Sequence, residues 1–297
     1  FMKKIIVWII FLCLTVVVFV LLLKPQKDNV GTKLSDTAKT DQTDMDIQQK
    51  VMAFTIDGRS SKGAKQWQLK GQSAEIQEDE IHLNQLEAVA YSEKGTVNIT
   101  SNKGIYRKTK GEVELLGEVK VRSEEGTTLE TERAIWVQGS KEVTTEDFVF
   151  IKRQGMTAAG VGGRANADDN TAALYKSVTV TMEPATRVDC DGALEVEYNN
   201  NRAVFHKNVR VRDKEGILFA DKLTIDFDSE TQEVVQGTAE GNVKIKRGKS
   251  YTLSQKAVYT ESTKSAELLG RPRIIIDPEE LAELEKRENK KSFIEGI

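Results

Sequence analysis

The sequence predicts an all-β protein built from antiparallel strands in repeats of about 30 residues. The first observation is a recurring β-branched pair, which reads Val-Lys-Val at 119–121 and Val-Lys-Ile at 243–245. Its first residue has counterparts at a near-constant spacing. These markers are Val89, Val119, Phe148, Val178, Val209, Val243 and Ile274. Such self-similarity is typical of repeat architectures, in which no single unit buries its own apolar face.

The second observation is a strict alternation of apolar and charged residues. Val188, Leu194 and Val196 share one parity, whereas Asp189 and Glu195 take the other. The next unit alternates in the same way through Ile217, Phe219, Leu223, Ile225 and Phe227. This pattern puts the apolar side chains on one face of a strand and the charges on the other. Each unit is therefore expected to be two strands around a turn.

Residues that tolerate unusual backbone angles mark the expected bends. Gly117, Gly241 and Gly270, with Asn208 at the matching place, suit a bend or bulge with a positive φ. Asparagines at 199–201 and the acidic run at 228–230 suit the tips of turns. We expect an open sheet of paired strands that bend at these positions.

The N-terminus predicts a membrane anchor over residues 1–23. The apolar run from Ile5 to Leu23 is long enough to span a bilayer as a helix. No small-x-small cleavage site follows it, and Lys3 and Lys4 favour a cytoplasmic N-terminus. A polar tether is expected at 24–50, with the β region exported.

The other end predicts a charged helical tail at 278–297. Asp277 can cap a helix, Pro278 fits its first position, and Glu279 and Glu280 complement the helix dipole. Leu281 and Leu284 form one short apolar stripe. That stripe is enough to cover a sheet edge and too short to form a domain.

Signs of catalysis are missing from the sequence. The net charge of −3, with both signs mixed, argues against nucleic acid as a partner. No nucleophile, base and orienting group come together, so we expect no enzyme and no cofactor. His82 and His206 stand in different repeats, which argues against zinc. Asp189 and Asp191 could bind calcium, but an alternating solvated face explains them better.

The two cysteines are not expected to form a disulfide. Cys13 lies in the apolar N-terminal run, whereas Cys190 lies on an inward parity. A reactive thiol is one interpretation of Cys190. A small buried apolar residue is the better one.

Beyond the tether the chain resembles two families of lipopolysaccharide export. "WQLKGQSAEI" at 67–76 and "TLETERAIWVQGSKEVTTEDFVFIKRQGMTAAGVGG" at 128–163 resemble the periplasmic domain of the LptC family. "LEVEYNNNRAVFHKNVRVRDKEGILFADKLTIDFD" at 194–228 resembles the LptA and OstA-like family. The resemblance implies an LptC-like jellyroll at 51–186 and an LptA-like extension at 187–277. It leaves open whether a separate LptA is needed.

The resemblance also implies an open β-jellyroll anchored in the inner membrane, with its bulk in the periplasm. Such a protein would receive lipopolysaccharide from the permease subunits of an ABC transporter. It would pass the lipid A acyl chains along an apolar trough to an LptA-like bridge protein or an outer-membrane translocon jellyroll. The apolar parity would line the trough because burial there removes acyl surface from water.

The residues expected to line the trough are the inward apolar positions of the strands. They are Trp67, Leu69, Val119, Val121, Leu129, Ile135, Val137, Phe148, Phe150, Val178, Val180, Val188, Leu194, Val196, Val209, Val211, Leu223, Ile225, Phe227, Val243 and Ile245. The end of the last repeat, at Ile274, Ile275 and Ile276, is expected to be a docking edge for the next jellyroll.

Two other interpretations remain at this point. The same alternation would suit a membrane-anchored structural β-solenoid or stalk of the cell envelope that has no lipid ligand. An enzyme that modifies envelope glycan is the second, and the missing catalytic constellation argues against it.

Overall fold

The computed structural model describes residues 49–59, 65–92, 95–166, 168–231 and 233–282. Over these residues the chain forms one 17-stranded sheet and a short 3-10 helix, η2 (Tyr198–Asn200). The strands are β1 (Gln49–Arg59), β2 (Lys65–Ile76), β3 (Glu80–Ser92), β4 (Gly95–Arg107), β5 (Glu112–Ser123), β6 (Thr128–Val137), β7 (Glu142–Arg153), β8 (Met156–Asn166), β9 (Thr171–Met182), β10 (Thr186–Cys190), β11 (Leu194–Glu197), β12 (Arg202–Arg212), β13 (Ile217–Phe227), β14 (Val234–Arg247), β15 (Ser250–Thr260), β16 (Ser265–Leu269) and β17 (Arg273–Ile275).

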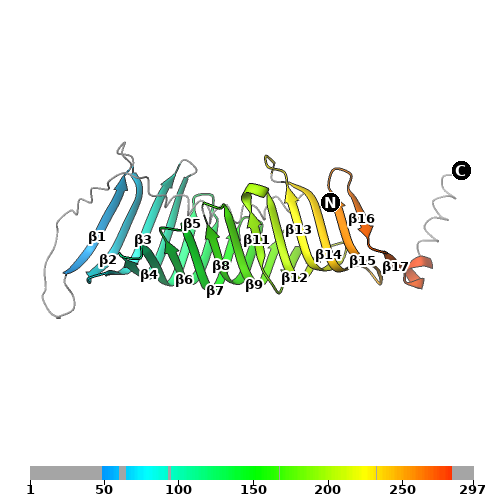
Figure 1. Cartoon of the computed structure of the whole chain (residues 1–297), viewed down its shortest axis with the longest axis horizontal. Coiled ribbons are helices and arrows are strands. Elements are labelled where there is room, and N and C mark those ends of the chain that lie inside the picture. Colours follow the sequence, from blue (N-terminus) through cyan, green and yellow to red (C-terminus); the bar gives the residue numbers. More distant parts are fainter. Residues whose placement is uncertain (1–48, 60–64, 93–94, 167, 232, 283–297) are drawn as a thin grey trace.

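The sheet is a meander that advances along the long axis of the molecule in chain order (Figure 1). In two places a pair of short strands occupies one position. β10 and β11 both lie between β9 and β12, and β16 and β17 both pair with β15. Every ladder between described residues is antiparallel, which confirms the predicted all-β antiparallel class and excludes a parallel β-solenoid for this part of the chain.

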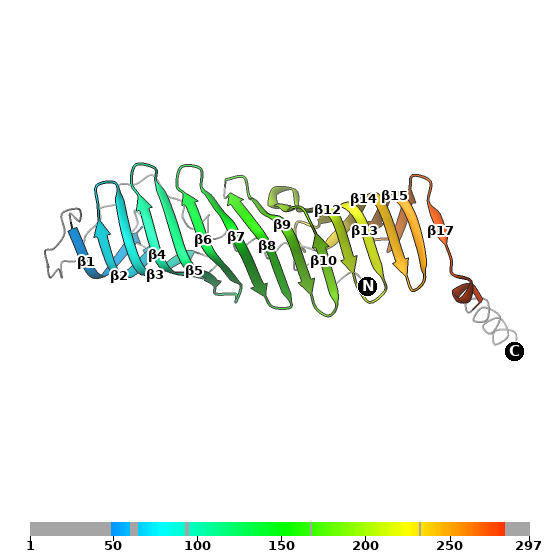
Figure 2. The same cartoon turned by 90° about the horizontal axis from the view of Figure 1, so that it is seen from below.

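The sheet is folded lengthwise into two layers. Many of the long strands carry an irregularity near the middle, such as the register shifts between Leu116 and Val119 in β5 and between His206 and Val209 in β12. A bulge bends the strand that contains it. Both layers are parts of the same sheet, and the second layer lies behind the first in Figures 1 and 2. The inner face of each layer therefore faces the other layer.

The predicted bend residues are confirmed. Gly117, Gly241 and Gly270 have φ angles of +75°, +77° and +81°, and Asn208 has +53°. At Gly241 an added Cβ would lie 2.3 Å from Asp221 Oδ2. This bend therefore favours glycine over other residues for a steric reason as well as for its positive φ.

Buried apolar side chains form two separate clusters. The N-terminal cluster contains Ala74, Leu83, Leu86, Val97, Ile99, Leu115 and Val119. The C-terminal cluster contains 25 residues from β7 to β15, and Ala203 and Phe205 within it are 0% exposed. The expected boundary at 186/187 lies inside this second cluster, because β9 pairs with β10 across it. The division of the apolar core falls instead at β6, with three strands, β7 to β9, between it and the expected boundary.

The predictions for the two chain ends can be compared with the structure only in part. Residues 278–282 are helical, and Asp277 Oδ1 accepts a hydrogen bond from the backbone N–H of Glu279 at 3.0 Å, which confirms the predicted cap. The anchor at 1–23, with Cys13, the tether up to residue 48 and the tail from 283, with Leu284, lie outside the described residues. In the described part of the chain, no helix is long and apolar enough to cross a membrane.

Candidate functional site

Strand β6 interrupts the apolar core. Of its ten residues, all of them described, Thr131 alone is buried. The ladder to β7 is also broken there, because the register passes directly from the pair Glu130–Phe150 to the pair Ile135–Thr144. The strand that separates the two clusters thus contributes little to either of them.

A cavity of about 60 Å³ lies at this interruption. Eight apolar residues from β4 to β7 line it: Val97, Ile99, Leu115, Val119, Val121, Leu129, Ala134 and Val143. The first four are buried, whereas the last four are half-buried and remain accessible to water. The cavity therefore combines a closed apolar floor with a partly accessible side.

Two hydroxyl side chains, Ser123 and Thr127, complete the lining at the turn between β5 and β6. Ser123 Oγ accepts a hydrogen bond from the backbone N–H of Thr127 at 3.2 Å. Thr127 is 2% exposed, and its Oγ1 has no hydrogen-bond partner among the described residues. Buried polar groups are nearly always hydrogen-bonded, so an unpaired one beside a cavity is unusual.

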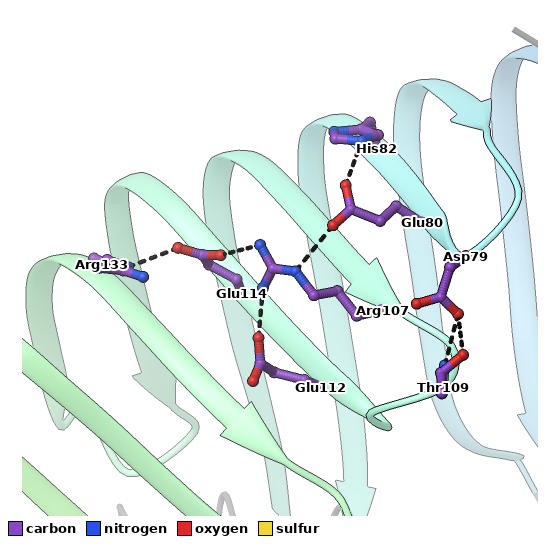
Figure 3. Close-up of polar contacts among 8 residues, drawn as sticks. All are labelled: Asp79, Glu80, His82, Arg107, Thr109, Glu112, Glu114 and Arg133. Atoms are coloured by element: carbon purple, nitrogen blue, oxygen red, sulfur yellow. Dashed lines mark hydrogen bonds and ion pairs between the residues drawn. The ribbon is translucent and has the colours of Figure 1, made fainter. Parts of the chain in front are cut away.

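An ion-pair network joins neighbouring strands on the outer face of the sheet (Figure 3). Arg107, at the end of β4, lies among three glutamates from neighbouring strands. Its Nε is 3.0 Å from Glu80 Oε1, its Nη2 is 2.8 Å from Glu114 Oε2, and its Nη1 contacts Glu112. Arg133 Nε binds the other oxygen of Glu114 at 2.7 Å. The network thus ties β3, β4, β5 and β6 together.

Glu114 is the most enclosed member of this network, with a side chain 7% exposed. Burial raises the pKa of its carboxyl, but hydrogen bonds and charges from Arg107 and Arg133 outweigh burial, so the pKa lies below its usual value. The hydrogen bonds that Arg107 donates to Glu114 and Glu112 raise the pKa of Arg107. Because Glu114 precedes the cavity residue Leu115, the network holds the cavity wall from outside.

Most of the predicted trough residues lie on the inner face. Trp67 pairs with the buried Ala90, and Leu69 packs against the N-terminal cluster. Val119, Val121 and Leu129 line the cavity. The other predicted residues found on this face belong to or pack against the C-terminal cluster: Val178, Val180, Val188, Leu194, Val196, Val209, Val211, Leu223, Ile225, Phe227, Val243 and Ile245. In that cluster the face is filled by its own side chains. Lipid contact at all these positions stays a prediction.

In β7 the parity prediction is wrong. Phe148 is 56% exposed and pairs with the exposed Val161, and Phe150 pairs with the exposed Glu130. Val149 and Ile151 are the buried residues of this strand. Val149 stands 30 residues after Val119, so a strict repeat count would have selected it instead of Phe148.

In β6 the predicted Ile135 and Val137 also lie on the outer parity. They pair with Glu114 and Glu112, and directly paired residues share a face of the sheet. The irregularity between Glu130 and Ile135 shifts the parity by one, which puts Ala134 on the cavity side.

The same error affects the start of β13. Phe219, expected inside, pairs with Arg210, whose guanidinium lies 5.3 Å from the centre of the Phe219 ring. A register shift between Phe219 and Lys222 restores the predicted parity for the rest of the strand.

Seven cavity residues were missed by the sequence argument: Val97, Ile99, Leu115, Ser123, Thr127, Ala134 and Val143. Alternation in β4, where Val97 and Ile99 are separated by an asparagine, was a usable signal. For Thr127 the sequence offers no signal, because a threonine in a turn is ordinary.

The expected docking edge is exposed and apolar. Ile274, Ile275 and Ile276 are 68%, 36% and 46% exposed, and β17 pairs with β15. The start of the tail is fixed to the turn before β15, since Glu280 accepts backbone hydrogen bonds from Lys249 at 2.8 Å and from Ser250 at 3.1 Å. The helix therefore begins beside the last strands of the sheet.

The polar residues considered as candidate metal ligands or a reactive thiol are accounted for by contacts within the chain. Asp189 binds Arg187 and Thr179, and no group of three metal-ligating side chains occurs within the described ranges. Cys190 is buried in the C-terminal cluster, and burial raises the pKa of its thiol to about 11. Cys190 is thus a small buried apolar residue with a neutral thiol.

Comparisons with known proteins divide the chain into two matched segments. A family model described as "Lipopolysaccharide-assembly, LptC-related" matches residues 8–183. A second, "LptA/(LptD N-terminal domain) LPS transport protein", matches residues 187–290. Among solved structures, LptH of Pseudomonas aeruginosa, described as the LptA homologous periplasmic component of its lipopolysaccharide transport device, matches with 11% identity and a TM-score of 0.34, covering 41% of this chain and 95% of that one. Comparison with curated proteins gave no match.

Proposed function

Because the chain belongs to the LptC-related family of lipopolysaccharide-assembly proteins, we propose that it is a membrane-anchored periplasmic component of a lipopolysaccharide export bridge. It receives lipopolysaccharide from the permease subunits of an ABC transporter at its N-terminal end. It passes the acyl chains along the inner face of the folded sheet toward the outer membrane.

One observation carries this proposal: a single sheet with an apolar inner face runs through both matched segments. Acyl chains crossing an aqueous compartment need a continuous apolar surface, since each Å² removed from water contributes about 25 cal/mol. The alternating charged face keeps the exterior of the sheet in solvent, and the charged sugars of the lipid can stay outside with it.

The anchor and the partners extend the proposal. The match to the LptC-related model begins at residue 8, inside the apolar run from Ile5 to Leu23, which supports a single span. At the other end, the exposed apolar segment from Ile274 to Ile276 supports pairing with an LptA-like protein or a translocon jellyroll.

Site-specific photo-crosslinking tests the lipid path. Crosslinkers at the inner positions Val119 and Val121 are expected to capture lipopolysaccharide in cells. Matched crosslinkers on the same strand, at the exposed Lys120 and Arg122, are expected to capture none. Equal capture from both faces contradicts the proposal.

Topology is tested separately with a membrane-impermeant cysteine reagent. Cysteines placed in the repeats are expected to react once the outer membrane alone is permeable. Labelling that requires disruption of the inner membrane contradicts the proposed location.

A further inference from the structure

The cavity at β6 has a polar group that its own surroundings leave unused. Thr127 is 2% exposed, lines the cavity and has no partner for Oγ1 among the described residues. A hydroxyl can donate one hydrogen bond and accept two, so leaving it unpaired in an apolar site is unfavourable. The site is incomplete without a polar atom placed beside Thr127.

Other buried threonines in this region show what a satisfied hydroxyl looks like. Thr131, eight per cent exposed and four residues further on, lies 3.4 Å from the hydroxyl of Thr145 and 3.5 Å from the carbonyl of Arg133. The described residues thus provide partners for the Thr131 hydroxyl on β6 but none for the Thr127 hydroxyl at the cavity. The unpaired hydroxyl of Thr127 is therefore a feature of the cavity and not of buried threonines in this region generally.

Water is a poor occupant for this position. A buried water needs two to four polar partners, and an apolar cavity without them stays dry. Here the lining side chains offer a water only two polar atoms, Thr127 Oγ1 and Ser123 Oγ, which is the lower limit, and Ser123 Oγ already uses one of its two lone pairs to accept the Thr127 backbone N–H. An apolar ligand with one oxygen atom matches the lining better than water does.

We propose that the cavity binds an acyl chain that carries a hydroxyl or carbonyl oxygen, and that this oxygen forms a hydrogen bond with Thr127 Oγ1. This inference rests on the proposed function and adds a specificity to it. Thr127 lies in the turn at the edge of the sheet, so the oxygen belongs near the head end of the chain. The alkyl part then runs inward along Val97 and Val119.

The size of the cavity determines how the chain enters. At about 60 Å³ it is smaller than an engineered cavity of about 150 Å³ that takes a benzene molecule. A chain therefore has to displace the half-buried side of the lining, at Val121, Leu129, Ala134 and Val143. The β6–β7 ladder is interrupted on this side between Glu130 and Ile135, so this stretch of β6 is held by its ladder to β5 and can separate from β7 without breaking hydrogen bonds between those two strands.

Two photoactivatable fatty acids of equal length test the inference, one with a hydroxyl on its β-carbon and one without. The full chain is reconstituted in lipid nanodiscs, labelled with each fatty acid, and the crosslinked peptides are mapped by mass spectrometry. We expect the β-hydroxy fatty acid to label the peptides containing Val119 and Leu129 about tenfold more, the effect of one satisfied buried hydrogen bond.

Three variants separate the hydroxyl from the shape of the cavity. Thr127→Val keeps the shape and is expected to reduce β-hydroxy labelling to the level of the plain fatty acid. Thr127→Ser keeps the hydroxyl and is expected to keep the preference. Thr131→Val removes a buried hydroxyl that does not line the cavity and is expected to leave the preference unchanged. Circular dichroism and the unfolding midpoint establish that each variant folds.

The outcomes distinguish this inference from the proposed function. Equal labelling of the cavity by both fatty acids in the unaltered chain overturns the role of Thr127 and leaves the lipid path standing. A Thr127→Val variant that loses both labels equally also overturns it. If neither fatty acid labels the cavity, the inference and the cavity's place in the lipid path fail together.

Discussion

Two regions of the same sheet use the same sequence pattern to different ends. The open segment, β2 to β6, has a cluster of seven buried apolar residues and a cavity at its border. The filled segment, β7 to β15, has 25 buried residues in its cluster, and Ala158, Val180, Ala203 and Phe205 within it are 0% exposed. Alternation therefore determines which face is apolar. Whether that face is filled or left open depends on how closely the two layers of the sheet approach each other.

On the outer face, the open segment has the more extensive ion pairing. In the open segment Arg107 joins three glutamates, and Glu114 within this network is nearly buried. In the filled segment the outer pairs are isolated and more exposed, such as Arg202 with Asp226. A segment with less inner packing is thus held by a polar network on its outer surface.

The largest expected difference concerns inner leucines. Leu194→Ala in the filled segment removes a side chain that is 1% exposed and is expected to lower the free energy of unfolding by about 3 kcal/mol. Leu129→Ala at the half-buried cavity wall is expected to lower it by about 1 kcal/mol. Denaturant unfolding of both variants measures the difference. Equal losses would show that the two segments are packed alike.

The second test reverses the comparison. Arg107→Met leaves the enclosed Glu114 with one partner fewer and is expected to lower the free energy of unfolding by about 2 kcal/mol. Arg202→Met, which breaks an exposed pair in the filled segment, is expected to cost about 0.5 kcal/mol. If Arg202→Met proves the more damaging, the outer network does not support the open segment.

The third test changes volume instead of charge. Ala134→Val adds two methyl groups to the cavity and is expected to raise the free energy of unfolding by about 1 kcal/mol. It is also expected to reduce lipopolysaccharide capture by a crosslinker at Val119. Ala203→Val, at a position without space, is expected to lower the free energy of unfolding by about 1 to 2 kcal/mol. A loss of stability for both variants would contradict an unfilled cavity at β6.

The smallest expected effect is a dependence on pH. The pKa of Glu114 is lowered in the folded chain, so its carboxylate stabilises the fold above about pH 4.5. That stabilisation is lost as the pH falls through the lowered pKa. Glu114→Gln is expected to flatten the decline of unfolding free energy in this acidic range, whereas Glu130→Gln, on the exposed face, is not. An unchanged slope for Glu114→Gln would remove the network from the pH response.

Much of the fold could be predicted from the sequence because alternation and the bend residues are local signals. Gly117, Asn208 and Gly241 mark bends, and Val119, Val178, Val209 and Val243 are each 1% exposed, as their common spacing implies. The errors at Ile135 and Phe148 have one cause. An irregular stretch in the strand changes the parity by one, and no residue type in β6 or β7 announces it.

The cavity could not be predicted from the sequence, for a different reason. Its lining comes from four strands, and its emptiness depends on how the two layers approach each other across β6. A sequence gives the identity of Ala134 and Thr127 but not the distance to the opposite layer. The division of the core also differs from the boundary between the matched segments: the clusters separate at β6, whereas the matched segments meet between residues 183 and 187.

Because the sheet is a meander, the length of the molecule depends on the number of its strands. Each strand pairs only with neighbours close in the chain, and no ladder between described residues joins the first strands to the last. Neighbouring strands lie about 4.8 Å apart, so a unit of two strands extends the molecule by about 10 Å. Duplicating or deleting one unit would alter the length and leave the remaining pairings as they are, as in other repeat proteins. The width of the gap such a protein can bridge is therefore set by the number of units in its gene.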